Sequence, residues 1–352
     1  MEPLRVKVEL QALGVRVPPE LFRRAGGAGP ADGVTVFMGG LSATVPATAP
    51  YAQRSPYAIS RDGGVWALFR KGEFLFEVQP APAPAFYGMS TPSGVGYKSI
   101  AIRHGKDAVG STVVQWCCRR GDSCRFCAIS ASAASGATKP RKDPRELAEV
   151  AAAARGEGYR HVVLTTGTTA GADRGSRYLA ECARAVKESA GLAVHVQFEP
   201  PDDLVFIERA AAAADTVAIN IECFDRRVLE EVAPGKAGTS LDAYIRSWKK
   251  AVEVFGPGQV VCFLIAGLGE DPSSILEGSR LLCSLGVYPF VLPFRPIPGT
   301  PLGDLEPPGA DEMLAVYEEV SDVVREAGLK AADCLAGCVR CGACSAMTDY
   351  TG

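Results

Sequence analysis

The chain has 352 residues, and its 37 Lys and Arg against 40 Asp and Glu leave a formal net charge of -3 at pH 7. This balance argues against a protein that binds nucleic-acid phosphates or anionic membranes, and no run approaches the roughly 20 apolar residues that cross a bilayer. The N-terminus carries charges where a signal peptide would be apolar. We therefore expect a cytoplasmic protein whose 12 cysteines are metal ligands and core residues rather than disulfides.

Residues 1–105 are rich in Gly, Pro and short β-prone runs, which predict a small β-rich N-terminal region or cap. The run 34–38 is predicted as a strand, and the runs 65–69 and 74–78 as a hairpin. A glycine-rich run at 26–30 resembles a phosphate-binding loop in composition, but a plain flexible loop is the preferred interpretation.

From about residue 110, strand-like runs alternate with helical stretches. The predicted strands are 112–117, 161–167, 193–199, 216–222, 259–267 and 287–294. The predicted helices are 144–157, 174–189, 202–214, 225–232, 241–255 and 271–285. Repeated β-then-α units indicate a parallel sheet with helices outside. We predict an α/β fold over residues 106–305, a partial (β/α)6 TIM-like barrel that carries its chemistry at the C-terminal ends of the strands.

Two neighbouring predicted strands, 193–199 and 216–222, alternate polar and apolar residues. Their polar positions include His195, Gln197, Glu199, Thr216, Asn220 and Glu222. A strand in a flat sheet covered on both faces would be apolar throughout. Polar groups at this depth need partners, which predicts a ligand-filled lumen. The alternative is a polar core layer that is satisfied by its own hydrogen bonds.

Four cysteines lie within eleven residues, directly after the first predicted strand: Cys117, Cys118, Cys124 and Cys127. Closely spaced thiolates suit a soft metal or an iron–sulfur cluster, because a short loop can point them at one centre. Three ligands would leave one metal coordination position open. A structural zinc site that uses all four thiols is the alternative.

A second cysteine cluster follows the last predicted helix (about 310–326), in a C-terminal region that we place at 306–352. Its members are Cys334, Cys338, Cys341 and Cys344, with the spacing C-x3-C-x2-C-x2-C. Their number and spacing fit zinc or a second 4Fe–4S cluster. Four neighbouring thiols in the cytosol would otherwise invite oxidation. We therefore predict a metal site in the tail.

The first cysteine cluster, at the end of the first strand of a partial barrel, resembles that of the radical S-adenosylmethionine (SAM) enzymes. The similarity is to the branch of biotin synthase, lipoyl synthase and the hydrogenase cofactor-maturation enzymes. The usual spacing is C-x3-C-x2-C. Here Cys118 gives C-x5-C-x2-C and Cys117 gives C-x6-C-x2-C, and both stay candidates. Phe126 matches the aromatic residue that covers the adenine in this family.

Later strand ends carry further similarities to this superfamily. Gly167, Thr168 and Thr169 stand where a Gly-Gly-Glu turn binds the methionine amino group, although the glutamate is missing. Asn220 and Glu222 resemble the Asn-x-Asp/Glu pair that contacts the ribose hydroxyls, and they share one strand face.

The fifth strand ends in Gly267-Leu268-Gly269-Glu270, which resembles the Gly-Leu-Gly-Glu near the adenine. The implied SAM-binding residues are Phe126, Gly167, Thr168, Thr169, Asn220, Glu222, Gly267 and Gly269.

The resemblance implies a radical SAM enzyme that cleaves SAM reductively at a 4Fe–4S cluster and uses the 5′-deoxyadenosyl radical on a small-molecule substrate in a biosynthetic pathway. The electron donor would be a protein such as ferredoxin or flavodoxin. His195, Glu199 and Arg295 are the candidate catalytic residues, with Arg295 as a possible anion clamp or a plain loop arginine. Because auxiliary clusters accompany many radical SAM enzymes, the resemblance favours a second 4Fe–4S cluster over zinc in the tail. The rival interpretations are a zinc-dependent barrel enzyme and a non-catalytic iron–sulfur carrier or scaffold.

A narrower similarity rests on the run 9–14 (Glu-Leu-Gln-Ala-Leu-Gly) and on the cysteine-rich tail. Both resemble the radical SAM proteins encoded in bacterial nitrilase-type gene clusters. This similarity implies no substrate.

Overall fold

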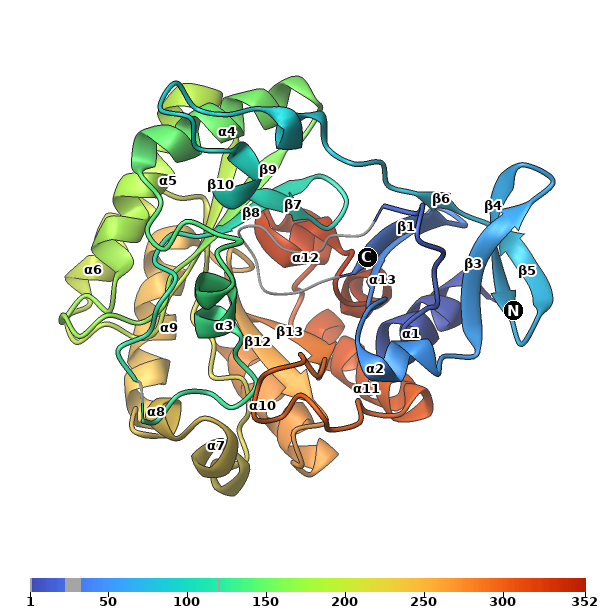
Figure 1. Ribbon diagram of the computed structural model, residues 1–352. Helices are drawn as coiled ribbons and strands as arrows, with labels where there is room; N and C mark the ends of the chain where they lie inside the picture. The colour runs from blue at the N-terminus through green and yellow to red at the C-terminus, as the bar shows by residue number, and fades with distance from the viewer. Residues whose placement is uncertain (1, 23–32, 120) are drawn as a thin grey trace.

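The computed structural model describes residues 2–22, 33–119 and 121–352. Its main body is a curled sheet of seven strands in the spatial order β13-β12-β11-β10-β9-β8-β7 (Figure 1). Neighbouring strands from β8 to β13 are parallel, and β7 (Ile102–His104) pairs antiparallel with β8 at one edge. The parallel strands are β8 (Ala108–Thr112), β9 (His161–Thr165), β10 (Ala193–Gln197), β11 (Thr216–Ala218), β12 (Val260–Ala266) and β13 (Tyr288–Pro293). The predicted α/β partial barrel is confirmed.

Helices cover the outer face of this sheet (Figure 1). They are α4 (Pro144–Gly156), α5 (Ser176–Ala190), α6 (Val205–Ala211), α7 (Arg226–Val232), α9 (Leu241–Phe255) and α10 (Pro272–Ser284). The start of α4 illustrates the local cause: the Asp143 side chain accepts from the backbone N–H of Arg145, and Glu146 completes a capping box. Among the described residues, no helix is both long and apolar enough to span a bilayer.

The first barrel strand begins earlier than the sequence pattern predicts. We expect a strand at 112–117, whereas β8 covers Ala108–Thr112. Its small residues, Gly110 and Ser111, have weak strand propensity, so the apolar run at Val113 and Val114 gives the stronger signal. Val113 N–H still donates to Thr165 O at 2.8 Å, which carries the chain past the sheet edge toward the first cysteine cluster.

In the described part of the N-terminal region there are two small sheets and two α-helices, one of which, α2 (Pro50–Gln53), is a single turn. One sheet has the order β2 (Leu41–Val45), β1 (Val34–Met38), β6 (Gln79–Pro80), and the other joins β3 (Tyr57–Asp62), β4 (Val65–Arg70) and β5 (Glu73–Glu77). The predicted hairpin is confirmed as β4–β5. The helix α1 (Pro3–Leu13) has no clear signal in the sequence, because its apolar residues alternate with Lys7 and Glu9. The glycine-rich run 26–30 lies outside the described residues.

The C-terminal segment lies at the open side of the barrel, between β13 and β7. There α11 (Ala310–Glu326), α12 (Gly337–Cys341) and α13 (Met347–Thr351) lie against the N-terminal region (Figure 1). Thr44 N–H donates to Ala343 O at 2.6 Å, and Lys7 Nζ donates to Gly342 O at 2.7 Å. The tail therefore closes the side that the sheet leaves open.

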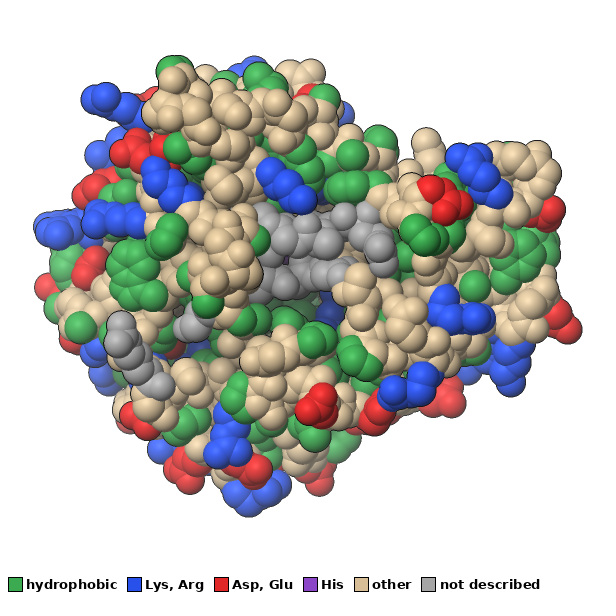
Figure 2. Space-filling model, viewed as in Figure 1, with side chains coloured by type: hydrophobic (Ala, Val, Ile, Leu, Met, Phe, Trp, Pro, Cys, Tyr) green, Lys and Arg blue, Asp and Glu red, His purple; other side chains and the backbone are tan. Residues whose placement is uncertain are grey.

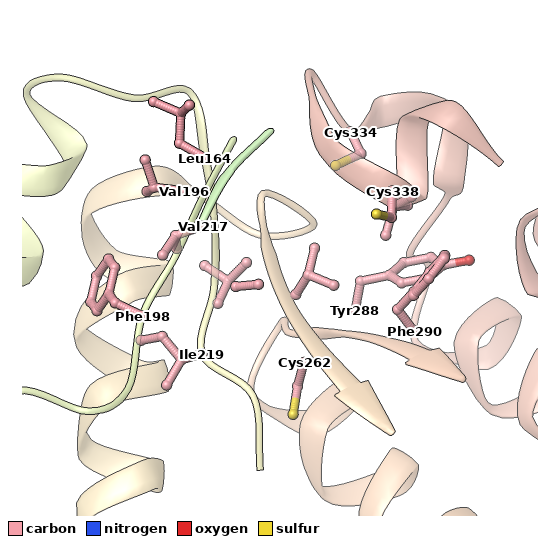
Figure 3. Close-up of a cluster of buried hydrophobic side chains, with 14 of the residues drawn as sticks. Leu164, Val196, Phe198, Val217, Ile219, Cys262, Tyr288, Phe290, Cys334 and Cys338 are labelled. Atoms are coloured by element: carbon pink, nitrogen blue, oxygen red, sulfur yellow. The ribbon is translucent and has the colours of Figure 1, made fainter. Parts of the chain in front are cut away.

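The core is a layer of apolar side chains from neighbouring strands, with two tail cysteines in the same cluster (Figure 3). Members shown there include Leu164, Val196, Phe198, Val217, Ile219, Tyr288, Phe290, Cys334 and Cys338. On the face shown in Figure 2, acidic and basic side chains are interspersed around the rim, and the surface is hollowed near its centre between hydrophobic side chains.

The buried Lys142 gives a testable pH dependence. Its Nζ donates to Thr138 Oγ1 at 2.6 Å and to Gln115 Oε1 at 3.1 Å, and burial lowers its pKa from 10.5 to about 7. Between these values the unfolded chain binds more protons, so this group makes the free energy of unfolding rise with pH.

We predict that Lys142→Met removes this rise. The difference in slope between wild type and variant should approach about 1.4 kcal/mol per pH unit in urea unfolding followed from pH 7 to pH 10. Parallel profiles for the two proteins would show that Lys142 keeps its ordinary pKa.

Candidate active site

A cavity of about 390 Å³ runs through the lumen of the barrel. Cys117, Cys124 and Cys127 line one end, where the chain has passed the C-terminal ends of the strands. His104 and Cys338 line the other end, where the tail fills the bottom of the barrel. The two cysteine clusters of the sequence therefore face one shared space.

The wall of the cavity is polar where the strand alternation predicts it. Gln197, Glu199, Asn220 and Glu222 all line the cavity. Their apolar neighbours, such as Val196, point into the core instead. The structure therefore brings together the polar residues at the ends of β10 and β11.

The first cysteine cluster separates into inward and outward thiols. Cys117, Cys124 and Cys127 line the cavity, whereas Cys118 does not, and its N–H donates to Thr168 O at 2.8 Å. Cys117 and Cys124 are partly buried, and Cys118 and Cys127 are exposed. Burial raises the pKa of Cys124 to about 12, and it also raises the pKa of Cys127. These thiols hold their protons at neutral pH until a cation displaces them.

Gly167 lets the cysteine loop pass close to the end of β9. Its N–H donates to Val114 O at 2.9 Å, and a Cβ at this position would lie 1.8 Å from Trp116 O. No side chain fits in that space, so glycine is required here. Thr168 lines the cavity beside it, while Thr169 N–H turns back toward Arg174 O.

A buried ion pair lies beside Asn220 and Glu222. Lys236, on the short helix α8 (Pro234–Ala237), places its Nζ 3.1 Å from Glu222 Oε1 and donates to Asn220 O at 2.6 Å. Burial alone would lower the pKa of Lys236, but attraction to Glu222 and other anionic groups outweighs it, and the pKa is raised. Asn220 Oδ1 accepts from Phe263 N–H at 3.1 Å, which fixes the orientation of the amide.

A second ion pair ties the cysteine loop to β10. Arg119 Nη2 lies 2.6 Å from Glu199 Oε2, and both side chains are largely buried. Arg119 and Lys236 carry no motif in the sequence. Each pairs with a carboxylate on a distant segment, so only the folded chain identifies them.

The Gly-Leu-Gly-Glu turn after β12 is organised around its own glutamate. Glu270 accepts from Gly267 N–H at 2.7 Å and from Leu268 N–H at 2.8 Å. Arg227 donates to Gly269 O at 3.4 Å. Phe126 lines the cavity, whereas Gly267 packs toward Pro308. The structure therefore brings Phe126 to the cavity, and it does not bring the turn residues to the wall.

His195 and Arg295, two of the predicted catalytic residues, lie away from the cavity wall. His195 is completely buried, its Nδ1 lies 2.7 Å from Thr216 Oγ1, and α12 packs on its ring at Gly337. Burial lowers its pKa to about 3, so the ring is neutral. Arg295 donates to Cys344 O at 2.8 Å and ties down the tail. Both residues belong to the seal between tail and barrel.

Two of the tail cysteines, Cys338 and Cys344, lie beside His104. His104 Nε2 lies 3.1 Å from Cys338 Sγ and 3.9 Å from Cys344 Sγ. Cys341 Sγ accepts from Lys106 N–H at 3.3 Å, and the Cys334 thiol donates to Ala336 O at 3.2 Å. His104 carries no motif and lies 234 positions before Cys338, so sequence spacing could not reveal this contact.

Comparison with known families identifies the barrel. The family model described as the radical SAM superfamily matches residues 112–282, which carry the first cysteine cluster and most of the β/α units. This segment, just under half of the chain, is similar to the radical SAM superfamily. Members of this superfamily are enzymes.

Two curated relatives share this radical SAM segment. Bacteriochlorophyllide c C-7(1)-hydroxylase of Chlorobaculum limnaeum is 29% identical over 224 residues, covering 58% of this chain and 56% of that protein. Mitochondrial lipoyl synthase of Leishmania braziliensis is 29% identical over 177 residues, covering 48% and 44%. The chain spans about half the length of these relatives. Among solved structures, methylornithine synthase is similar over 63% of both chains, with 19% identity and a TM-score of 0.49.

The buried pair of Lys236 and Glu222 allows a stability test within this barrel. Their side chains are 9% and 12% exposed, so Lys236→Met leaves a carboxylate in a low-dielectric site without its cation. We predict that the free energy of unfolding falls by about 3–5 kcal/mol and that adding Glu222→Gln recovers much of the loss.

Denaturant unfolding of the single and double variants measures this coupling. Arg226→Met is the control, because the Arg226–Glu230 pair is more than half exposed and should contribute at most about 1 kcal/mol. A Lys236→Met variant as stable as this control would contradict the buried pair.

Proposed function

We propose that the protein is a radical SAM enzyme that acts on a small-molecule substrate inside the barrel. The observation that carries the proposal is that Cys117, Cys124 and Cys127 face one cavity that the polar side chains of Gln197, Glu199, Asn220 and Glu222 also line. When bound, a 4Fe–4S cluster and SAM supply a 5′-deoxyadenosyl radical that removes a hydrogen atom from the substrate. The cavity of about 390 Å³ is within the usual range for small-molecule sites.

The thiols fit such a cluster. Three inward cysteines on one short loop suit three irons and leave one coordination position for a ligand in the cavity. Of the two candidates for the first ligand, Cys117 has the better position, because it lines the cavity together with Cys124 and Cys127 and Cys118 does not. The proposed motif is therefore C-x6-C-x2-C.

The polar wall suits the nucleoside of SAM. Asn220 offers its amide N–H groups to the cavity, because its Oδ1 already accepts from Phe263. Phe126 supplies an aromatic surface, and Thr168 and Gly167 supply backbone groups beside the cysteine loop. Glu222 faces the same space with Lys236 beside it. Thr169, Gly267 and Gly269 stay predictions as SAM-binding residues.

Glu199 is better suited to positioning than to proton transfer. Its pairing with Arg119 at 2.6 Å fastens the cysteine loop to β10 and so fixes where the thiols point. The tail, behind the other end of the cavity, adds a second metal centre to the proposal. A reduced ferredoxin or flavodoxin is the expected electron donor, in the cytoplasm, and the narrower similarity to nitrilase-cluster proteins stays a prediction.

A zinc-dependent barrel enzyme is the second candidate. The single observation in its favour is the close approach of His104, Cys338 and Cys344. A zinc-dependent mechanism does not explain why three further thiols line the opposite end of the same cavity.

The two adjacent cysteines provide the test. We predict that Cys117→Ser abolishes both the iron of the first cluster and the formation of 5′-deoxyadenosine, because it removes an inward ligand. Cys118→Ser is the matched control and should keep most of both. The measurements are iron content after anaerobic reconstitution and chromatographic detection of 5′-deoxyadenosine with SAM and dithionite. If Cys118→Ser loses iron and 5′-deoxyadenosine formation while Cys117→Ser keeps them, Cys118 is the ligand. If the wild-type protein binds iron but forms no 5′-deoxyadenosine, the proposed function is wrong.

A further inference from the structure

We infer that His104, Cys338 and Cys344 form an open metal site for one soft divalent cation, of the Zn²⁺ type, at the lower end of the cavity. The metal site stands on its own geometry, while its use in anchoring a substrate rests on the proposed function. The nitrogen and the two sulfur atoms lie within 4.8 Å of one another. They come from β7 and from the tail, which the fold brings together.

The distances favour a single ion over a cluster. His104 Nε2 lies 3.1 Å from Cys338 Sγ and 3.9 Å from Cys344 Sγ. Tetrahedral zinc, with bonds of about 2.0–2.3 Å, places neighbouring ligand atoms about 3.5–3.8 Å apart. A 4Fe–4S cube attaches each thiolate to a different iron and so holds the sulfurs farther apart. The three ligand atoms therefore match a mononuclear site.

The other two tail cysteines have different surroundings. Cys341 Sγ accepts from Lys106 N–H and lies near Asp107 and His161. Cys334 donates to a carbonyl of its own loop, Ala336 O. The proposed site therefore uses two of the four tail thiols and a histidine, and the four-thiol site stays a prediction.

The surrounding chain holds these ligands in place. His104 pairs with Ala108 across the β7–β8 turn. That turn packs tightly on α12, since a Cβ at Gly105 would lie 2.3 Å from Cys341 Sγ. On the other side, Arg295 donates to Cys344 O. Ligands that are fixed before binding lower the cost of ordering the site.

One coordination position faces the cavity. His104 and Cys338 line the same space as the thiols of the first cluster. Zinc sites with three protein ligands, including Cys₂His sets, leave the fourth position to water or substrate. A metal here would bind a Lewis-basic group of the substrate, such as a thiolate, carboxylate or amine, and direct the rest of the molecule toward the mouth of the barrel. The substrate class is therefore a small molecule with a metal-binding end.

The test measures zinc affinity in the full-length chain. Cys124→Ser and Cys127→Ser are introduced first, so that the loop cannot bind zinc, and a chromophoric chelator competes for the metal anaerobically. We expect one tightly bound zinc, at least 100-fold weaker binding after His104→Ala, Cys338→Ser or Cys344→Ser, and unchanged binding after Cys334→Ser, the matched control. None of these outcomes depends on SAM cleavage, so failure here is distinct from failure of the proposed function.

Spectroscopy on a protein whose tail is unaltered tests the metal site even if one of the tail variants fails to fold. Zinc X-ray absorption should report two sulfur ligands with nitrogen or oxygen completing the set. In the cobalt-substituted protein, 2-mercaptoethanol as a small thiol probe should shift the visible bands as it enters the open position. The inference would be overturned by the absence of zinc binding, by loss of zinc in Cys334→Ser, or by a zinc ion with four sulfur ligands. Uptake of a further iron–sulfur cluster by the tail, or cobalt bands that do not respond to the thiol, would overturn it as well.

Discussion

A parallel sheet of six strands curls but does not close, and the rest of this structure depends on how its open side and lower end are filled. The gap lies between β13 and β7, where strand edges would otherwise present unpaired backbone groups. The C-terminal segment lies there: Thr44 N–H donates to Ala343 O, and Tyr288 Oη and Thr351 Oγ1 share a hydrogen bond. The tail is therefore part of the barrel, and its cysteines form the end of the lumen.

Because the tail fills the lower end of the barrel, the polar groups at the two ends of the lumen have different surroundings. At the lower end His195 is neutral and completely buried under α12, and its Nε2 has no hydrogen-bond partner among the described residues. At the upper end Glu199 pairs with Arg119, and Glu222 pairs with Lys236. The space between them stays open as the cavity. Three thiols of the cysteine loop and the thiol of Cys338 thus line opposite ends of one cavity.

The sequence predicts the elements that depend on local signals. The helix expected at 241–255 matches α9, and Asp143 with Pro144 marks the start of α4, because caps and amphipathic periodicity act over a few residues. The same reasoning misplaces the first strand, where Gly110 and Ser111 weaken the pattern, and gives no sign of α1.

The site is predictable only in part, for a similar reason. The cysteine loop and the pair of Asn220 and Glu222 follow from their motifs. The predicted shared strand face is wrong, because β11 ends at Ala218 and Glu222 has a φ of 73°. Arg119, Lys236 and His104 act through partners on distant segments, so their roles emerge only when the chain is folded. Equally, nothing in the sequence indicates that the tail would bury His195.

Electron paramagnetic resonance tests the central claim, that three inward thiols hold a cluster with an open position, most directly. Full-length protein reconstituted anaerobically and reduced should give a 4Fe–4S signal whose shape changes when SAM is added, and Cys338→Ser should keep that response because its thiol lies at the other end of the cavity. A protein that takes up no iron at the cysteine loop, or a signal indifferent to SAM, would contradict the account.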